Sequence, residues 1–304
     1  MSNARRANQP ARTIVMTGAT AGIGLAAADR LRGENARLLI GARSGVLGGD
    51  SLALDLASVS SVRSFAAAVE SQLGDANIDG LVLNAGMQTH SIDARTEDAL
   101  ETTFATNHLA HYLLLRLLMP RLAQGATVVI TTSDLHDPKT NSLAPPEHAD
   151  AALLARGQTR LHSSSDVMAV MRAYAASKLC NLLTAYALST SAFARARGLR
   201  VVAFNPGLTP GTGLIRNQPR VFKFLFGLFV SMLGPLLRMN TVAGGGDLLA
   251  DLVLGRITPP AGRIFASQSK RQLSWPDPST MATDLVAAKL WRDSAALVGL
   301  SDAL

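Results

Sequence analysis

The chain alternates short apolar, β-branched runs with longer stretches whose apolar residues have helical spacing. This alternation constrains the fold most, because strands joined by helices pair in parallel and need helices on both faces. The expected strands are residues 13–17, 37–41, 51–55, 79–83, 126–132, 199–204 and 262–267. We therefore predict an α/β fold, a doubly wound (Rossmann) parallel sheet of about seven strands with helices on both faces.

Neither an internal repeat nor a linker interrupts this alternation. We therefore expect residues 12–304 to form a single domain, preceded by a disordered basic arm at residues 1–11. The expected helices lie near residues 25–31, 58–73, 96–122, 168–197, 241–254 and 280–298.

Several small or polar residues stand where the expected strands end. Right-handed crossovers place all carboxyl ends of parallel strands on one edge of the sheet. Ligands of such sheets bind in the crevice at that edge. The residues predicted to meet there are Gly18, Arg43, Asp55, Asn84, Ser133 and Pro206.

A glycine-rich turn, Gly18-Ala-Thr-Ala-Gly-Ile-Gly24, joins the first strand to the first helix. Glycines let the backbone approach a pyrophosphate closely, and the helix N-terminus supplies amide donors and a partial positive charge. The spacing differs from G-x-G-x-x-G, and an ordinary strand-to-helix loop is the alternative. Its position directly after the first strand favours a dinucleotide site.

Arg43 follows the second strand, where a doubly wound sheet faces the adenosine ribose of a dinucleotide. An acidic residue there would bind the ribose 2′-hydroxyl, but none is present. The arginine therefore favours the 2′-phosphate of NADP, with a solvated surface arginine as the alternative.

Tyr174 and Lys178 stand one helical turn apart in an Ala- and Leu-rich stretch. A positive charge about 5 Å from the phenol, at an effective dielectric of about 20, contributes roughly 3 kcal/mol. The Tyr174 pKa should then fall by about two units, which would make the phenol a usable proton donor near neutral pH.

Composition excludes some classes of function. The formal charge of +7 comes from scattered arginines without a basic, aromatic-studded run, so no nucleic-acid partner is expected. The single Cys180 excludes an internal disulfide and indicates a reducing, cytoplasmic location. His108 and His111 lack further ligands in the pattern, so we expect no metal. Asn107, among apolar neighbours, needs a hydrogen-bond partner.

Together these motifs resemble the short-chain dehydrogenase/reductase family over roughly residues 12–300. Asn107, Ser133, Tyr174 and Lys178 match its catalytic tetrad in order. Other stretches, such as Thr106-Asn-His-Leu-Ala-His111, are similar to the branch that holds retinol dehydrogenases and light-dependent protochlorophyllide reductases. The cofactor contacts that the resemblance implies are Gly18, Thr20, Ala21, Gly22, Ile23, Gly24, Arg43, Asp55, Leu56, Asn84, Ala85, Gly86, Tyr174, Lys178, Pro206, Gly207 and Thr209.

The resemblance also implies a mechanism. Ser133 would hydrogen-bond the substrate carbonyl and Tyr174 would protonate it, while NADPH supplies the hydride. Lys178 would lower the Tyr174 pKa and bind the nicotinamide ribose, and Asn107 would hold a water that links Lys178 to solvent. A carbonyl reductase or alcohol dehydrogenase is the first hypothesis. A reductase of polarised C=C bonds and a non-catalytic NADP-binding regulatory protein are the alternatives.

The substrate side is expected to consist of insertions at about residues 134–170 and 208–240. Within the second, residues 221–237 are strongly apolar. A buried helix and a membrane span are alternatives, but we favour a lid over a bulky apolar substrate. The same apolar surface could contact a membrane peripherally or support a homo-oligomer.

Overall fold

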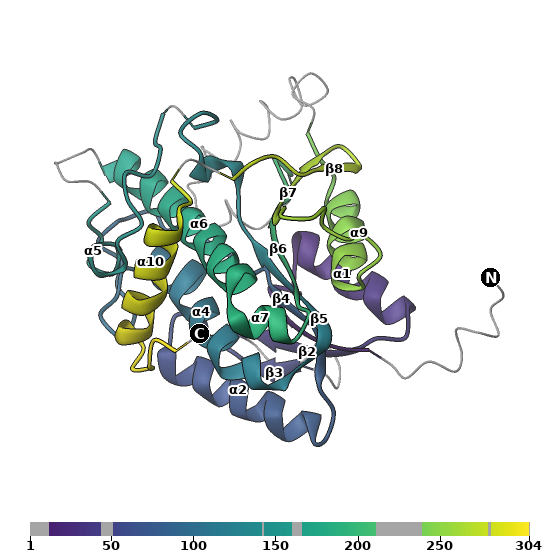
Figure 1. Ribbon diagram of the computed structural model, residues 1–304. Helices are drawn as coiled ribbons and strands as arrows, with labels where there is room; N and C mark the ends of the chain where they lie inside the picture. The colour runs from purple at the N-terminus through teal and green to yellow at the C-terminus, as the bar shows by residue number, and fades with distance from the viewer. Residues whose placement is uncertain are drawn as a thin grey trace.

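Eight strands form one sheet in the order β3-β2-β1-β4-β5-β6-β7-β8, and the pairing is parallel from β3 to β7 (Figure 1). β8 pairs antiparallel with β7 at the edge. The structure is a computed structural model that describes residues 12–43, 51–141, 143–159, 166–210, 239–278 and 281–303. The strands are β1 Thr13–Thr17, β2 Arg37–Ala42, β3 Ser51–Ala53, β4 Ile78–Leu83, β5 Leu122–Thr131, β6 Arg200–Asn205, β7 Phe265–Ser269 and β8 Gln272–Ser274.

Helices cover both faces of this sheet, which confirms the predicted doubly wound architecture (Figure 1). One apolar core joins the sheet to α1 and α9. The other joins it to α2, α4 and α6, with α10 packed outside. The main helices are α1 Gly22–Gly33, α2 Val59–Leu73, α3 Thr102–Phe104, α4 Ala110–Leu118, α5 Ala151–Ala155, α6 Asp166–Thr190, α7 Ala192–Ala196, α9 Val242–Val253 and α10 Asp284–Leu297.

The central strands were recognisable in the sequence because they are buried on both faces. β1, for example, is buried at every position, and such strands consist of nearly continuous apolar, β-branched residues. Helix α2 begins where the sequence indicates, since the Ser58 side chain accepts a hydrogen bond from the Ser61 amide.

The helix expected over residues 96–122 is shorter than predicted. Helix begins at Thr102, where the buried Glu101 carboxylate accepts hydrogen bonds from the Thr103 and Phe104 amides. A π-helical turn, Ala105–Leu109, then precedes α4. β5 begins at Leu122 instead of residue 126, and its pairing with β4 shifts register between the pairs Ile78–Leu122 and Gly80–Thr127.

The two expected insertions are described only in part. The first contains a 3₁₀ turn, Asp134–His136, and the short helix α5. The apolar segment 221–237 lies outside the described residues, so its interpretation as a lid stays a prediction.

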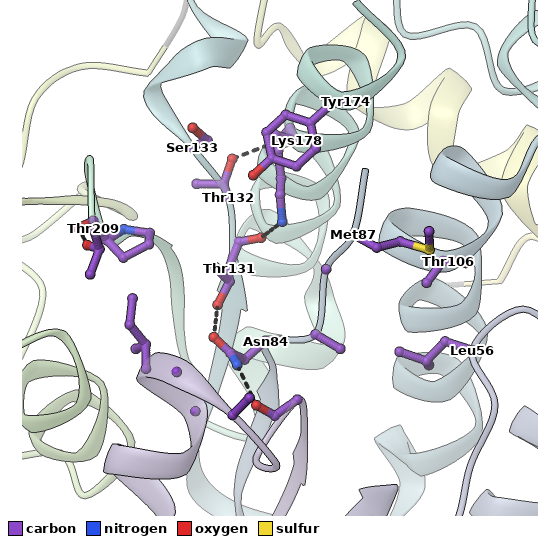
Figure 2. A pocket seen from close by; sticks show the side chains of 18 of the residues that line it. Leu56, Asn84, Met87, Thr106, Thr131, Thr132, Ser133, Tyr174, Lys178 and Thr209 are labelled. Carbon is purple, nitrogen blue, oxygen red and sulfur yellow. Dashed lines mark hydrogen bonds between the residues drawn. The ribbon is translucent and has the colours of Figure 1, made fainter. Parts of the chain in front are cut away.

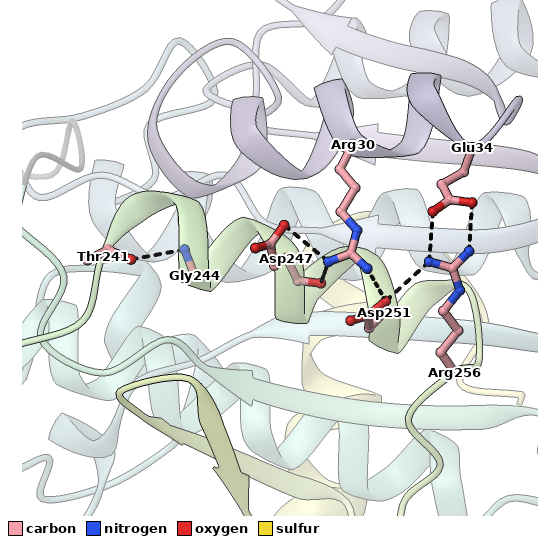
Figure 3. A network of polar contacts seen from close by, with 7 residues as sticks. All are labelled: Arg30, Glu34, Thr241, Gly244, Asp247, Asp251 and Arg256. Carbon is pink, nitrogen blue, oxygen red and sulfur yellow. Dashed lines mark hydrogen bonds and ion pairs between the residues drawn. The ribbon is translucent and has the colours of Figure 1, made fainter.

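Helix α9 lies directly against α1, the helix that follows the glycine-rich turn (Figure 1). Their contact is close because α9 presents glycines: a Cβ on Gly246 would lie 2.5 Å from the Ala26 Cβ and 2.8 Å from the Ala27 amide nitrogen. Partly exposed ion pairs, such as Arg30 to Asp251 at 2.6 Å, run along the rim of the contact (Figure 3). Exposed pairs contribute little to stability, so the glycine contact fixes how closely the helices approach.

Gly246→Ala should therefore lower the free energy of unfolding by about 1–3 kcal/mol, because the added methyl group overpacks the α1–α9 contact. Denaturant unfolding checks this value. Gly33→Ala in α1 is the matched control: its Cβ would meet nothing within 4 Å, and alanine favours helix by up to about 1 kcal/mol. Equal stability changes in the two variants would contradict the packing explanation.

Candidate active site

A cavity of about 580 Å³ lies at the carboxyl edge of the parallel strands. Its wall comes from the β1–α1 turn, the ends of β2, β4, β5 and β6, and α6 (Figure 2). Apart from Asn107, which is buried, every residue predicted for the site lines this cavity. These residues are Gly18, Thr20, Ala21, Gly22, Ile23, Gly24, Arg43, Asp55, Leu56, Asn84, Ala85, Gly86, Ser133, Tyr174, Lys178, Pro206, Gly207 and Thr209.

The glycine-rich turn fits tightly against the end of β4. Gly18 has a φ of 69°, and a Cβ there would lie 2.7 Å from the Ala85 Cα. A Cβ on Gly24 would lie 2.0 Å from the Gly18 carbonyl oxygen. Only glycine fits at these two positions, so the backbone itself forms this wall of the cavity.

The N-terminus of α1 suits an anionic group. The N-cap residue Ala21 makes no side-chain capping hydrogen bond, and the first turn holds no acidic residue. The N-cap side chain thus satisfies none of the first amides of α1, while the helix dipole adds partial positive charge. The turn therefore fits the pyrophosphate of a dinucleotide.

Hydrogen bonds tie the ends of β1, β4 and β5 together. The Thr17 hydroxyl oxygen accepts from the Asn84 and Ala85 amides at 3.0 and 3.2 Å. The Asn84 side chain donates to the Gly18 carbonyl at 3.2 Å and accepts from the Thr131 hydroxyl at 3.1 Å (Figure 2). Asn84 thus holds the glycine-rich turn in place from below the cavity.

Arg43 and Asp55 occupy the end of the cavity near β2 and β3. Arg43 directly follows β2 and is exposed. Strand β3 ends at Ala53 rather than at Asp55 as predicted. The exposed Asp55 carboxylate accepts a hydrogen bond from the Ala57 amide at 3.0 Å, which shapes the turn into α2.

Tyr174 and Lys178 are both buried on the cavity side of α6. The Lys178 Nζ lies 5.6 Å from the centroid of the Tyr174 ring and donates to the Thr131 carbonyl at 3.2 Å (Figure 2). Burial lowers the pKa of Lys178 to about 8. Burial, reinforced by the negative charge of Asp134, raises the pKa of Tyr174. The predicted lowering of the Tyr174 pKa by Lys178 is therefore wrong for this arrangement, because desolvation of the phenolate outweighs the attraction.

The buried Asn107 side chain forms the hydrogen bonds that its burial requires. It lies in the π-helical turn, donates to the Met87 carbonyl at 2.8 Å and to the Ser177 hydroxyl at 3.1 Å, and accepts from the Met87 amide at 2.8 Å. A Cβ on Gly86 would lie 3.3 Å from the Lys178 Nζ and 3.7 Å from the Asn107 Oδ1. Asn107 thus fixes the segment after β4 against α6.

Ser133 follows β5 as the N-cap residue of the 3₁₀ turn Asp134–His136, and Figure 2 shows it next to Thr132. Its hydroxyl accepts from the Leu135 amide at 3.3 Å and donates to the Asp134 carboxylate at 3.2 Å. Sequence reasoning missed Asp134 as a site residue, although its place directly after Ser133 was a usable signal. The other lining residues not predicted are Gly41, Ala42, Leu54, Ala57, Met87, Thr106, Thr131, Thr132, Leu135, Asn205, Leu208 and Pro210.

Buried histidines serve as hydrogen-bond partners behind the site. His111 contacts the Thr17 hydroxyl and the Asn107 carbonyl, at 2.9 and 3.0 Å, and His108 contacts Ser294 at 3.1 Å. The described residues hold no group of three or more His, Cys, Asp or Glu side chains placed to bind a metal. Within that same part of the chain, none of the helices has the length and apolar character needed to span a membrane.

The chain matches known proteins over most of its length. The short chain dehydrogenase family model matches residues 12–142. Dehydrogenase/reductase SDR family member 13 from Bos taurus is 32% identical, covering 95% of this chain and 74% of that protein. A proposed daunorubicin C-13 ketoreductase, DnrU, from Streptomyces sp. (strain C5) is 31% identical, covering 95% and 93%.

Protochlorophyllide reductase from Daucus carota is 30% identical, covering 95% of this chain and 78% of that protein. These similarities confirm the resemblance to the retinol dehydrogenase and protochlorophyllide reductase branch that the motifs indicated. The chain therefore belongs to the short-chain dehydrogenase/reductase family of NAD(P)-binding oxidoreductases.

Proposed function

We propose that the protein is an NADPH-dependent reductase of bulky apolar carbonyl compounds, able to oxidise the corresponding alcohols in reverse. The observation that supports this most is the meeting of Ser133, Tyr174 and Lys178 at one cavity whose other wall fits a dinucleotide. NADPH, when bound, supplies the hydride. The glycine-rich turn, Arg43 and Lys178 would hold it.

The protein's own groups would handle the proton. Tyr174 donates its phenolic proton to the substrate carbonyl oxygen, and Ser133 orients that oxygen by a hydrogen bond. Lys178, with its pKa lowered to about 8, lies near the phenol ring, where its charged form stabilises a developing tyrosinate. Asn107 holds the backbone of Met87 beside Lys178 and so keeps this part of the site in place.

Exposed apolar side chains that line the cavity support the proposal of an apolar substrate. Leu135 and Leu208 both line the cavity and are 39% and 48% exposed. Exposed large apolar side chains at a cavity commonly mark a binding surface. The ketoreductase among the relatives agrees with carbonyl reduction.

Reduction of a polarised C=C bond is the second candidate, supported by the similarity to protochlorophyllide reductase. In that case Tyr174 would protonate carbon or an enolate oxygen. Matched saturated and α,β-unsaturated ketones separate the two reactions when NADPH consumption is followed and the products are identified. Carbonyl reduction predicts alcohols from both, whereas C=C reduction predicts a saturated ketone from the unsaturated one.

Arg43→Ala should weaken NADPH binding by about tenfold to a hundredfold and change NADH binding less than about twofold. A charge-assisted hydrogen bond to the 2′-phosphate is worth roughly 1.5–3 kcal/mol. Calorimetric titration of both cofactors checks this. Arg32→Ala, which removes an arginine from α1 that pairs with Asp29, is the control. Equal affinity of the wild type for both cofactors would refute the preference.

A further inference from the structure

Asp134 lines the same cavity as Ser133, and its carboxylate lies within hydrogen-bond distance of the Ser133 hydroxyl. It is the first residue of the 3₁₀ turn after β5, it is half-buried, and it lines the cavity with Ser133 and Tyr174. Within the described part of the chain, no arginine, lysine or histidine forms an ion pair with it. A carboxylate only accepts hydrogen bonds, and so does a carbonyl oxygen, so a plain ketone beside it brings no favourable contact.

The Asp134 carboxylate also accepts the hydrogen bond that, in the proposed mechanism, the Ser133 hydroxyl must donate to the substrate carbonyl. The Ser133 hydroxyl has one proton, and it donates that proton to the Asp134 Oδ1 at 3.2 Å. The Leu135 amide meanwhile donates to the Ser133 oxygen at 3.3 Å. Ser133 can therefore donate to a substrate carbonyl only by giving up its bond to Asp134. Unless another donor replaces it, the carboxylate then loses a hydrogen bond in a partly desolvated place.

A substrate can supply that replacement itself. A hydroxyl or ammonium group on the carbon next to the carbonyl could donate to Asp134 while the carbonyl oxygen accepts from Ser133 and Tyr174. The Asp134 charge also acts on the catalytic phenol, since it helps to raise the Tyr174 pKa. Partial neutralisation by an adjacent donor would ease formation of tyrosinate as the proton leaves.

We propose that Asp134 is a specificity-determining residue that selects carbonyl substrates with a hydroxyl or ammonium group on the adjacent carbon. This inference rests on the proposed carbonyl reduction and names its substrate class. It predicts that the donor-bearing member of a matched pair of ketones is preferred, and that the preference depends on the carboxylate.

The test uses two matched pairs, α-hydroxyacetophenone with acetophenone and acetoin with butanone. kcat/KM is measured with NADPH for the wild type and for Asp134→Asn. The adjacent hydroxyl also makes the carbonyl intrinsically more reactive, so the decisive quantity is the change in the ratio between the two enzymes. We expect Asp134→Asn to lower kcat/KM for the hydroxyketones by about tenfold or more and to raise it several-fold for the plain ketones.

Asp137→Asn is the matched control. Asp137 is the C-cap residue of the same 3₁₀ turn but does not line the cavity, so this variant should keep the wild-type ratio. NADPH affinity and Tm, measured for each variant, separate loss of selectivity from misfolding.

An unchanged ratio in Asp134→Asn, or a wild type that prefers the plain ketones, would overturn the inference and leave carbonyl reduction standing. If the wild type binds NADPH but reduces no member of either pair, the proposed function fails for these ketones and this inference fails with it. The inference is supported if the ratio of kcat/KM for the hydroxyketone to kcat/KM for the plain ketone falls in Asp134→Asn but not in Asp137→Asn.

Discussion

Tyr174→Phe should lower kcat for NADPH-driven reduction by about a hundredfold to ten-thousandfold, the usual contribution of a positioned general acid. The substitution removes the phenolic hydroxyl and keeps the buried ring, which lies beside the Lys178 ammonium. Because packing is conserved, NADPH affinity and Tm should stay close to the wild-type values. The defect should therefore appear in kcat.

Steady-state kinetics, cofactor titration and thermal unfolding of the same preparation check this expectation. Tyr186→Phe is the matched control, because Tyr186 lies on the same helix α6 and does not line the cavity. A Tyr174→Phe enzyme with wild-type turnover would exclude Tyr174 as the proton donor.

Acid should destabilise the protein steeply between about pH 6.5 and pH 4. Burial lowers the pKa of His108 to about 3 and that of His111 to about 4, from the ordinary histidine value of about 6.5. Below pH 6.5 the unfolded chain therefore binds protons that the folded chain does not. Stability present above pH 6.5 is lost as the pH falls, by about 1.4 kcal/mol per pH unit for each histidine. That slope is large beside a typical total stability of about 5–15 kcal/mol.

Urea unfolding at a series of pH values measures this slope. His111→Gln should reduce this slope by about 1.4 kcal/mol per pH unit, because it removes one histidine whose pKa is lowered in the folded protein. His90→Gln replaces an exposed histidine and should leave the slope as in the wild type. If the free energy of unfolding of the wild type does not change between pH 7 and pH 4.5, the claim that buried His108 and His111 stay neutral in the folded protein is contradicted.

The central part of the fold was predictable because its signals are local and strong. β1 and α2 have the bounds or caps that their residues indicate. β8 was missed, since its three residues include only one apolar side chain, Leu273, and it forms only by pairing with β7. The π-helical turn at Ala105–Leu109 was missed as well, because its hydrogen bonds leave no pattern in side-chain spacing.

The site was predictable for a topological reason. Once the strand order is known, residues at strand ends must meet at one edge, and the cavity lies there. The pKa values and the side-chain neighbours within the site could not be predicted, because they depend on how far solvent is excluded and on how the side chains are placed. The raised pKa of Tyr174 follows from its burial and from the charge of Asp134, which lines the same cavity from the turn after β5.

Carbonyl reduction by this protein can be tested most directly by tracing the hydride. The wild type is incubated with a ketone substrate and NADPH that contains deuterium at the hydride-donating carbon of the nicotinamide. NMR and mass spectrometry of the product then locate the label. We predict one deuterium on the former carbonyl carbon, with no transfer above background in Tyr174→Phe. Deuterium on a carbon of a former C=C bond, or no deuterium in any organic product, would contradict carbonyl reduction.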